Sequence, residues 1–192
     1  MRAFRSLTAR AAVLDRPDVD TDQIVPKQFL KRIERSGFGE FLFYDWKKDP
    51  GFELNRPEAE RARILLAGAN FGCGSSREHA AWALQDYGFE VVIAPSFGDI
   101  FYANALQIGL VPVRLPETKD VMAAAAGGSE VTVDLESQTV AAGGSAWPFS
   151  IDPFVRQCLL EGLDTIALTL RHEDDIAAFE ARTPARIATT SL

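Results

Sequence analysis

The residues best suited to chemistry lie in segment 68–79, which reads Gly-Ala-Asn-Phe-Gly-Cys-Gly-Ser-Ser-Arg-Glu-His. Two hydroxyl groups, those of Ser75 and Ser76, stand beside the guanidinium of Arg77. The glycines and the asparagine before them permit the backbone angles of a tight loop. At the start of a helix, such a loop gathers backbone N–H groups and a positive charge around the two hydroxyls. This arrangement suits the binding of a carboxylate substrate and the formation of an unusually acidic serine.

The better-known glycine-loop motifs do not fit this segment. A dinucleotide-binding fingerprint that begins at Gly72 needs a third glycine where Arg77 stands, and a P-loop needs a Gly-Lys pair that is absent. A nucleophile elbow needs a glycine two residues after Ser76, where Glu78 stands. One structural alternative is that Ser75 caps the following helix and forms a capping box with Glu78. The glycine run favours a functional loop over this alternative.

Composition limits the class of protein. The 192 residues are 47% hydrophobic, which is typical of a globular protein. The net charge is 20 − 27 = −7, which argues against a surface built for nucleic acid. No apolar run approaches the length of a membrane span, and the N-terminal segment lacks the hydrophobic core of a signal peptide. We therefore expect a cytoplasmic protein with no membrane and no nucleic-acid partner.

Cysteine and histidine are too sparse to build a metal site. Cys73 and Cys158 are far apart in the sequence, and neither has His79 or His172 at a zinc-ligand spacing. An iron–sulfur cluster needs more thiolates than this chain owns. We therefore expect no metal and no cofactor to be bound by this chain alone.

The elements that position the loop alternate between strand and helix. Short apolar runs predict strands, and longer amphipathic patterns predict helices, which favours parallel strands with right-handed crossovers. Two alternating segments predict a hairpin that a third piece can join. The expected strands are 11–14 (at an edge), 64–67, 90–94, 110–113, 131–135, 139–142 and 147–151, and the expected helices are 80–87, 97–107, 121–126, 153–161 and 164–181, the last with a break near His172.

The first third of the chain is less regular. Residues 15–26 form a polar, aspartate-rich loop, and residues 27–45 are rich in aromatic side chains. Residues 47–61 are predicted to be a surface connection or a short irregular insertion. We predict a single α/β domain over residues 1–192, with a flexible tail from about residue 184.

Three motifs together resemble the aconitase superfamily: Asp20-Thr21-Asp22-Gln23-Ile24 with Pro26, Gly72-Cys73-Gly74-Ser75-Ser76-Arg77-Glu78-His79-Ala80, and Ala94-Pro95-Ser96-Phe97-Gly98-Asp99-Ile100-Phe101. Within it, four further segments are similar to the small subunits of bacterial 3-isopropylmalate dehydratase: Lys27-Gln28-Phe29-Leu30, Gly37-Phe38-Gly39, Leu42-Phe43-Tyr44-Asp45-Trp46 and Gly162-Leu163-Asp164. The likeness runs over essentially the whole chain.

This resemblance implies a fold, a partner and a reaction. The implied fold is the aconitase-type swivelling β/β/α domain, with a mixed or parallel sheet flanked by helices. The implied partner is a large subunit that carries a [4Fe–4S] cluster, in a heterodimer or heterotetramer, which agrees with the thiol count. The implied reaction removes water from 2-isopropylmalate and adds it back one carbon over, through isopropylmaleate, to give 3-isopropylmalate in leucine biosynthesis.

The resemblance also implies roles for the serine loop. Ser75 is the base, acting as an alkoxide that backbone N–H donors and a nearby cation stabilise. Arg77 is the clamp on a substrate carboxylate, because its planar fork allows bidentate recognition. Ser76 contacts the substrate or fixes the loop. The residues alone do not rank the two serines, and this division rests on the family.

Four further residues have two interpretations each, and Cys73 has one. Asp22 belongs to a motif near the superfamily's active site, where it can orient a partner histidine or a proton relay, but it equally suits turn chemistry. Phe29 and Leu30 can line a pocket for the isopropyl group, although phenylalanine is commonly a core residue. His79 can support the loop or be an ordinary helix residue, and Cys73 is interpreted as a small buried residue between glycines.

Two other functions stay open. The nearer one is the small subunit of a related hydro-lyase, acting on citraconate, dimethylmaleate or homoaconitate. The farther one is a regulatory subunit that has kept the fold and lost the chemistry. The presence of Ser75, Ser76 and Arg77 together counts against a regulatory subunit.

Overall fold

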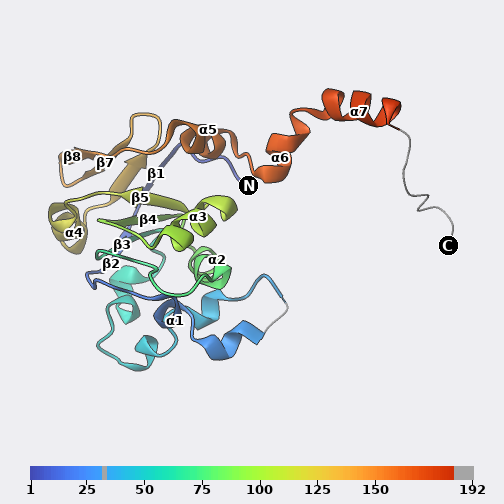
Figure 1. Cartoon of the computed structure of the whole chain (residues 1–192). Coiled ribbons are helices and arrows are strands. Elements are labelled where there is room, and N and C mark those ends of the chain that lie inside the picture. The colour runs from blue at the N-terminus through green and yellow to red at the C-terminus, as the bar shows by residue number, and fades with distance from the viewer. Residues whose placement is uncertain (32–33, 184–192) are drawn as a thin grey trace.

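Two four-stranded sheets lie at the centre of the structure, a computed structural model that describes residues 1–31 and 34–183 (Figure 1). One sheet is parallel, in the order β2 (Ala11–Leu14), β3 (Ile64–Ala67), β4 (Val91–Ala94), β5 (Val111–Arg114). The other is antiparallel, in the order β1 (Ser6–Ala9), β6 (Val131–Asp134), β7 (Thr139–Ala142), β8 (Ser145–Pro148). A single residue, Arg10, separates β1 from β2, so the chain passes directly from one sheet to the other.

Helices surround these sheets. The α-helices are α1 (Thr21–Ile24), α2 (Glu78–Tyr87), α3 (Asp99–Ile108), α4 (Lys119–Ala126), α5 (Pro153–Glu161), α6 (Thr165–Leu170) and α7 (Glu173–Arg182). Five short 3-10 helices occupy the first third: η1 (Lys27–Lys31), η2 (Gly39–Phe41), η3 (Trp46–Lys48), η4 (Glu53–Asn55) and η5 (Pro57–Ala59). Within the described residues, no helix is both long and apolar enough to cross a bilayer.

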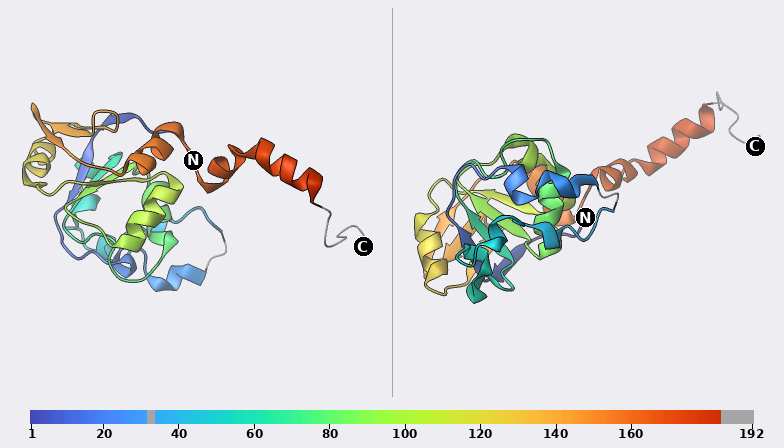
Figure 2. Two further views of the ribbon diagram at one scale, coloured as in Figure 1. Left: turned by 45° about the horizontal axis from the view of Figure 1, so that its top comes forward. Right: turned by 90° about the horizontal axis from the view of Figure 1, so that it is seen from below.

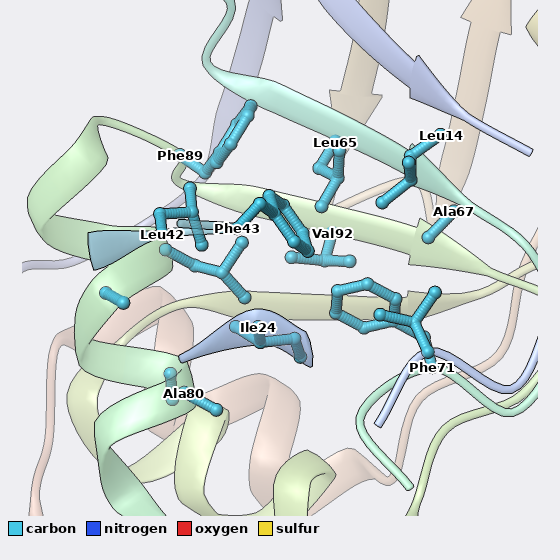
Figure 3. Close-up of a cluster of buried hydrophobic side chains, with 14 of the residues drawn as sticks. Leu14, Ile24, Leu42, Phe43, Leu65, Ala67, Phe71, Ala80, Phe89 and Val92 are labelled. Atoms are coloured by element: carbon cyan, nitrogen blue, oxygen red, sulfur yellow. The ribbon is translucent and has the colours of Figure 1, made fainter. Parts of the chain in front are cut away.

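The parallel sheet separates two hydrophobic cores because apolar side chains leave both of its faces. On one face, Leu65 and Val92 pack with residues of α1, α2 and the aromatic segment, as Figure 3 shows. On the other face, Ile64 and Val91 pack against the antiparallel sheet, with contributions from α4 and α5. The layers are therefore sheet, sheet and helices, which confirms the predicted β/β/α fold class.

Most predicted elements are present, and the differences have local causes. The expected helix at 97–107 begins later, at Asp99, because Phe97 pairs with Phe71 in an isolated bridge. The break near His172 is confirmed, since α6 ends at Leu170 and His172 is the N-cap of α7. The third hairpin piece is β8, which is 145–148 rather than 147–151. β1 was not predicted, and the expected flexible tail from 184 lies outside the described residues.

For residues 47–61 the structure favours the second of the two predicted alternatives, a short irregular insertion. The segment is irregular, as expected, and consists of η3, η4 and η5. It is not merely a surface connection, however, because Phe52 and Leu54 are buried in the core beside the edge strand β2. This segment covers an edge that would otherwise expose unpaired backbone groups.

Candidate active site

The serine loop, residues 68–77, connects the carboxyl end of β3 to the start of α2. In open parallel sheets, ligands bind at the carboxyl ends of the strands. The loop needs its glycines. Gly72 has φ +74°, and a Cβ added there would lie 2.3 Å from the Phe101 ring. Gly74 has φ +93°, the left-handed region that glycine adopts at low cost.

Loops from the two neighbouring strands hold this loop in place. The Phe71 N–H donates to the Ser96 carbonyl at 3.0 Å, and the Asn70 N–H donates to Ser96 Oγ at 2.8 Å. On the other side, Asn70 Nδ2 donates to Asp18 Oδ1 at 2.8 Å. Segments that follow β2, β3 and β4 therefore meet at one edge of the parallel sheet, and this edge carries the site.

Helix α1 fastens the part of the loop that carries the serines. The Thr21 N–H donates to the Cys73 carbonyl at 3.0 Å, and Thr21 Oγ1 donates to the Ser75 carbonyl at 3.1 Å. One residue later, the Asp22 carboxylate forms an ion pair with the Arg77 guanidinium. Thr21 is 2% exposed. These three contacts fix the backbone of Ser75 and the side chain of Arg77 relative to the sheet.

The site is open on the side where the serines lie. Ser75 and Ser76 are exposed, whereas the Arg77 side chain is only 17% exposed. A hydroxyl that must act as a strong base needs a site from which water is excluded. The described residues do not cover the two serines, so a role as base for either serine would require a second surface that closes the site.

The helix-capping interpretation of Ser75 is wrong. Arg77, with extended backbone, occupies the N-cap position of α2, and no side-chain hydrogen bond caps the helix there. Ser75 lies two residues before the N-cap. The N–H groups in the first turn of α2 therefore remain available to stabilise negative charge at the end of the loop.

The structure brings Asp22 to Arg77, and it shows contacts of Phe29 and Leu30 with the aromatic segment and the core. The Phe29 ring stacks on Phe41 with centroids 4.0 Å apart and meets Tyr44 edge-on at 4.8 Å. Phe29 and Leu30 are half-buried against the core. Their described contacts thus support a packing role, and a role in a substrate pocket stays a prediction.

The surroundings of His79 and Cys73 shift the pKa values of these two side chains in opposite directions. His79 contacts Phe38 and Trp82 with ring centroids 5.0 and 4.8 Å apart, and burial lowers its pKa. It is therefore an uncharged packing residue of α2 at neutral pH. Cys73 is half-buried, not fully buried as predicted, and partial burial raises the pKa of its thiol. The thiol is therefore protonated at neutral pH.

The donor groups of this chain do not fit an iron–sulfur cluster. Cys73 lies in the serine loop, whereas Cys158 is buried on α5. Across residues 1–31 and 34–183, no three His, Cys, Asp or Glu side chains come together as metal ligands.

Sequence reasoning did not predict that Thr21 contacts the serine loop. Thr21 lies within one of the recognisable motifs, but its partner is the backbone carbonyl of Ser75, which lies 54 positions away and leaves no local trace. The signal that could have found it is a hydroxyl residue at the first position of a helix that also carries the predicted site residue Asp22.

Comparisons with known proteins agree with this geometry. The family model of the aconitase C-terminal domain matches residues 1–118, and the LeuD_N model matches residues 121–153. A third model, the C-terminal domain of the 3-isopropylmalate dehydratase small subunit, matches residues 165–186. The relative from Acidobacterium capsulatum, named 3-isopropylmalate dehydratase small subunit, is 56% identical over 185 residues and covers 94% of this chain and 90% of its own.

Two further proteins extend the comparison. The relative of the same name from Frankia alni is 56% identical over 189 residues, covering 96% of this chain and 97% of its own. The crystal structure of 3-isopropylmalate dehydratase from Methanocaldococcus jannaschii superposes with a TM-score of 0.70 at 26% identity, covering 91% of this chain and 99% of that one.

Proposed function

The chain belongs to the family of 3-isopropylmalate dehydratase small subunits, and from this premise we propose how it divides the catalytic work with a large subunit. It is part of a hydro-lyase of leucine biosynthesis. In the proposed division, this chain supplies the base and the carboxylate clamp. The large subunit supplies the surface that closes the site.

Ser75 is the proposed base. The dehydration removes a proton from a carbon beside a carboxylate, which requires a strong base. The proton passes to Ser75 Oγ, and the electron pair forms the new double bond as the hydroxyl group leaves the neighbouring carbon. Rehydration returns the proton. The Arg77 guanidinium and the first-turn N–H groups of α2 stabilise the alkoxide form of the serine before the proton arrives.

Arg77 is the proposed clamp, and its contact with Asp22 carries the proposal. A guanidinium has five N–H donors, so it can pair with Asp22 and still offer donors to a substrate carboxylate. Asp22 acts through Arg77 and is therefore a positioning residue in this proposal. Ser76 contacts the substrate from the adjacent position. The ion pair joins residues 55 positions apart at the only loop where a guanidinium lies beside two exposed serines among the described residues.

The proposal also includes the cofactor of the large subunit, the substrate and the assembly of the two subunits. A [4Fe–4S] cluster on the large subunit supplies a Lewis acid for the leaving hydroxyl group. The substrate is 2-isopropylmalate, with its isopropyl group near Phe29 and Leu30. The chain acts as a single swivelling domain in a cytoplasmic heterodimer or heterotetramer.

An anaerobic mixing assay tests this function. The chain is combined with its large subunit, whose cluster has been reconstituted, and alkene absorbance is followed from 2-isopropylmalate, citraconate and homocitrate in parallel. We expect each subunit alone to be inactive and the mixture to prefer 2-isopropylmalate. Preference for another substrate would move the chain to a related hydro-lyase. A formed complex that turns over none of them would favour a regulatory subunit.

The contact between Thr21 and Ser75 leads to a second test. Thr21→Val keeps the shape of the side chain but leaves the Ser75 carbonyl without its donor, which costs about 1–2 kcal/mol. If the loss of this hydrogen bond displaces Ser75 and raises the activation free energy by the same amount, kcat drops by about tenfold with little change in KM. Thr21→Ser keeps the hydroxyl and is expected to keep most of kcat. Steady-state kinetics of the assembled enzyme measure both, and a wild-type kcat in Thr21→Val would show that the contact does not position Ser75.

A further inference from the structure

The C-terminal arm, residues 165–182, extends away from the sheets and helices (Figures 1 and 2). It consists of α6, which lies beside the body, and α7, in which every residue is exposed. Helices shorter than about 12–15 residues are marginal in water without tertiary contacts. α7 has 10 residues and no described packing on the body, so its stability calls for a surface that the rest of this chain does not provide.

The arm concentrates exposed apolar side chains. Of the seven large hydrophobic residues that are exposed among the described residues, four lie on it: Ile166 (69% exposed), Leu170 (55%), Ile176 (36%) and Phe179 (56%). Ile166 and Leu170 are four positions apart on α6, and Ile176 and Phe179 are three apart on α7, so each pair shares one face of its helix. These four residues are the apolar seam.

The seam is bordered by negative charge. α7 carries four acidic residues, Glu173, Asp174, Asp175 and Glu180, against one basic residue, Arg182, for a net charge of −4 + 1 = −3. Glu180 lies four positions after Ile176, and Asp175 lies four positions before Phe179, so both are helical neighbours of the seam. Arg182 lies over the Phe179 ring, 5.8 Å from its centroid, but the net negative charge of α7 still favours an apolar groove whose rim is mainly basic.

A cavity lies between α6 of the arm and α2, the helix that follows the serine loop. Its volume is about 430 Å³, and its lining includes Leu168 of α6, Trp82 of α2 and Glu78, the residue that follows Arg77. Asn104 also lines it, and the Nδ2 of that side chain is shielded from solvent yet has no hydrogen-bond partner among the described residues. The arm and the helix that begins at the end of the serine loop therefore border the same cavity.

The family models distinguish the arm from the body. The aconitase C-terminal domain model ends at residue 118, whereas the arm falls within residues 165–186, which match the C-terminal domain specific to the dehydratase small subunits. A domain that is linked to its neighbour gains a high effective concentration from the linker. A separate subunit has no such linker and must hold its partner through contacts of its own.

We propose that the arm is the docking element that holds this chain on the large subunit, with the apolar seam in a groove whose rim is basic. The proposal rests on the proposed function for the identity of the partner. In this arrangement the arm supplies affinity and the serine loop supplies chemistry, so the loop can close and open over the substrate while the subunits stay associated.

Two double variants of the full chain test this proposal. Ile176→Ala with Phe179→Ala removes half of the seam while raising helix propensity, so a loss of binding cannot result from a weaker helix. The matched control, Ala178→Ser with Ala181→Ser, changes two residues on the opposite side of α7, lowers helix propensity and keeps the seam. Both variants are titrated into the cluster-loaded large subunit, with complex formation followed by analytical ultracentrifugation and turnover measured in the same samples.

We expect the seam variant to raise the dissociation constant of the complex by about tenfold or more, because it truncates two aromatic or aliphatic anchors. Turnover at a saturating concentration of the variant should match the wild type, and the control should bind as the wild type does. Added salt should weaken wild-type association, since the acidic border contributes. Wild-type affinity in the seam variant would overturn the proposal, as would a wild-type chain that dimerises through the seam by itself. A complex that forms normally but turns over no substrate would contradict the proposed function and leave docking supported.

Discussion

The assembled enzyme with Ser75→Ala is expected to lose kcat by roughly 10³-fold or more, because a positioned general base contributes about 10²–10⁴-fold and no other described side chain replaces it at the end of the loop. The substitution removes only an exposed hydroxyl. The Ser75 carbonyl still accepts from Thr21 Oγ1, and the backbone of the loop keeps its contacts. Folding stability and affinity for the large subunit should therefore stay within about 0.5 kcal/mol of wild type.

Ser76→Ala is the matched control for this prediction. It removes the adjacent exposed hydroxyl from the same loop, so a nonspecific effect on the loop would appear in both variants. We expect a much smaller loss of kcat for Ser76→Ala, with any effect mainly on KM. The reverse order of effects would assign the base to Ser76, and full activity in both variants would place the base outside this loop. Stopped-flow measurement of alkene formation under anaerobic conditions separates the chemical step from product release.

The fold could be predicted from the sequence where burial is uniform. All four residues of β3 and of β4 are buried, and a short apolar run followed by a helical pattern is the expected signature of such strands. β1 could not be predicted in this way. Its four residues, Ser-Leu-Thr-Ala, gain strand geometry only by pairing with β6, whose residues lie about 125 positions later. The hairpin was predicted, but not that β1 would complete its sheet.

In the site, too, features made by residues close in the sequence were predictable, whereas contacts between distant segments were not. The serine loop was recognisable because glycines, serines and an arginine occur together within a dozen residues. The ion pair of Asp22 with Arg77 joins segments 55 residues apart, and no local pattern encodes the distance between them. For Phe29 the sequence predicted either a core or a substrate-pocket role and could not choose between them, because an aromatic residue in a segment rich in aromatic residues suits both.

The arm shows a further limit of sequence reasoning. The helical pattern of residues 164–181 and its break at His172 were predictable from local residues. However, a helix whose apolar face packs on its own domain and a helix whose apolar face binds another protein have the same spacing of apolar residues. Only the three-dimensional structure shows that every residue of α7, Ile176 and Phe179 included, is exposed to solvent.

Arg77→Lys is expected to lower kcat/KM by about 100-fold, because the loss of one charge-assisted contact of about 2–3 kcal/mol corresponds to that factor. A guanidinium can pair with Asp22 and a substrate carboxylate at once through separate edges of its fork, whereas an ammonium group is a single point charge on a flexible stem. Lysine retains the positive charge, so the experiment isolates the geometry of the clamp from its charge. Thermal unfolding should change little, since lysine can still pair with Asp22.

Arg63→Lys provides the control for this substitution. Arg63 forms an ion pair with Glu90 before β4, so the same chemical change is made in an ion pair that has no contact with the serine loop. It should leave kcat and KM at wild-type values. For Arg77→Lys, a rise in KM alone would mean that the clamp holds substrate and transition state equally, and an equal fall in kcat and kcat/KM would place the decisive contact in the transition state. Either result keeps Arg77 in the site, and only wild-type values of both constants would remove it, because a bidentate contact to a carboxylate cannot survive its replacement by lysine unchanged.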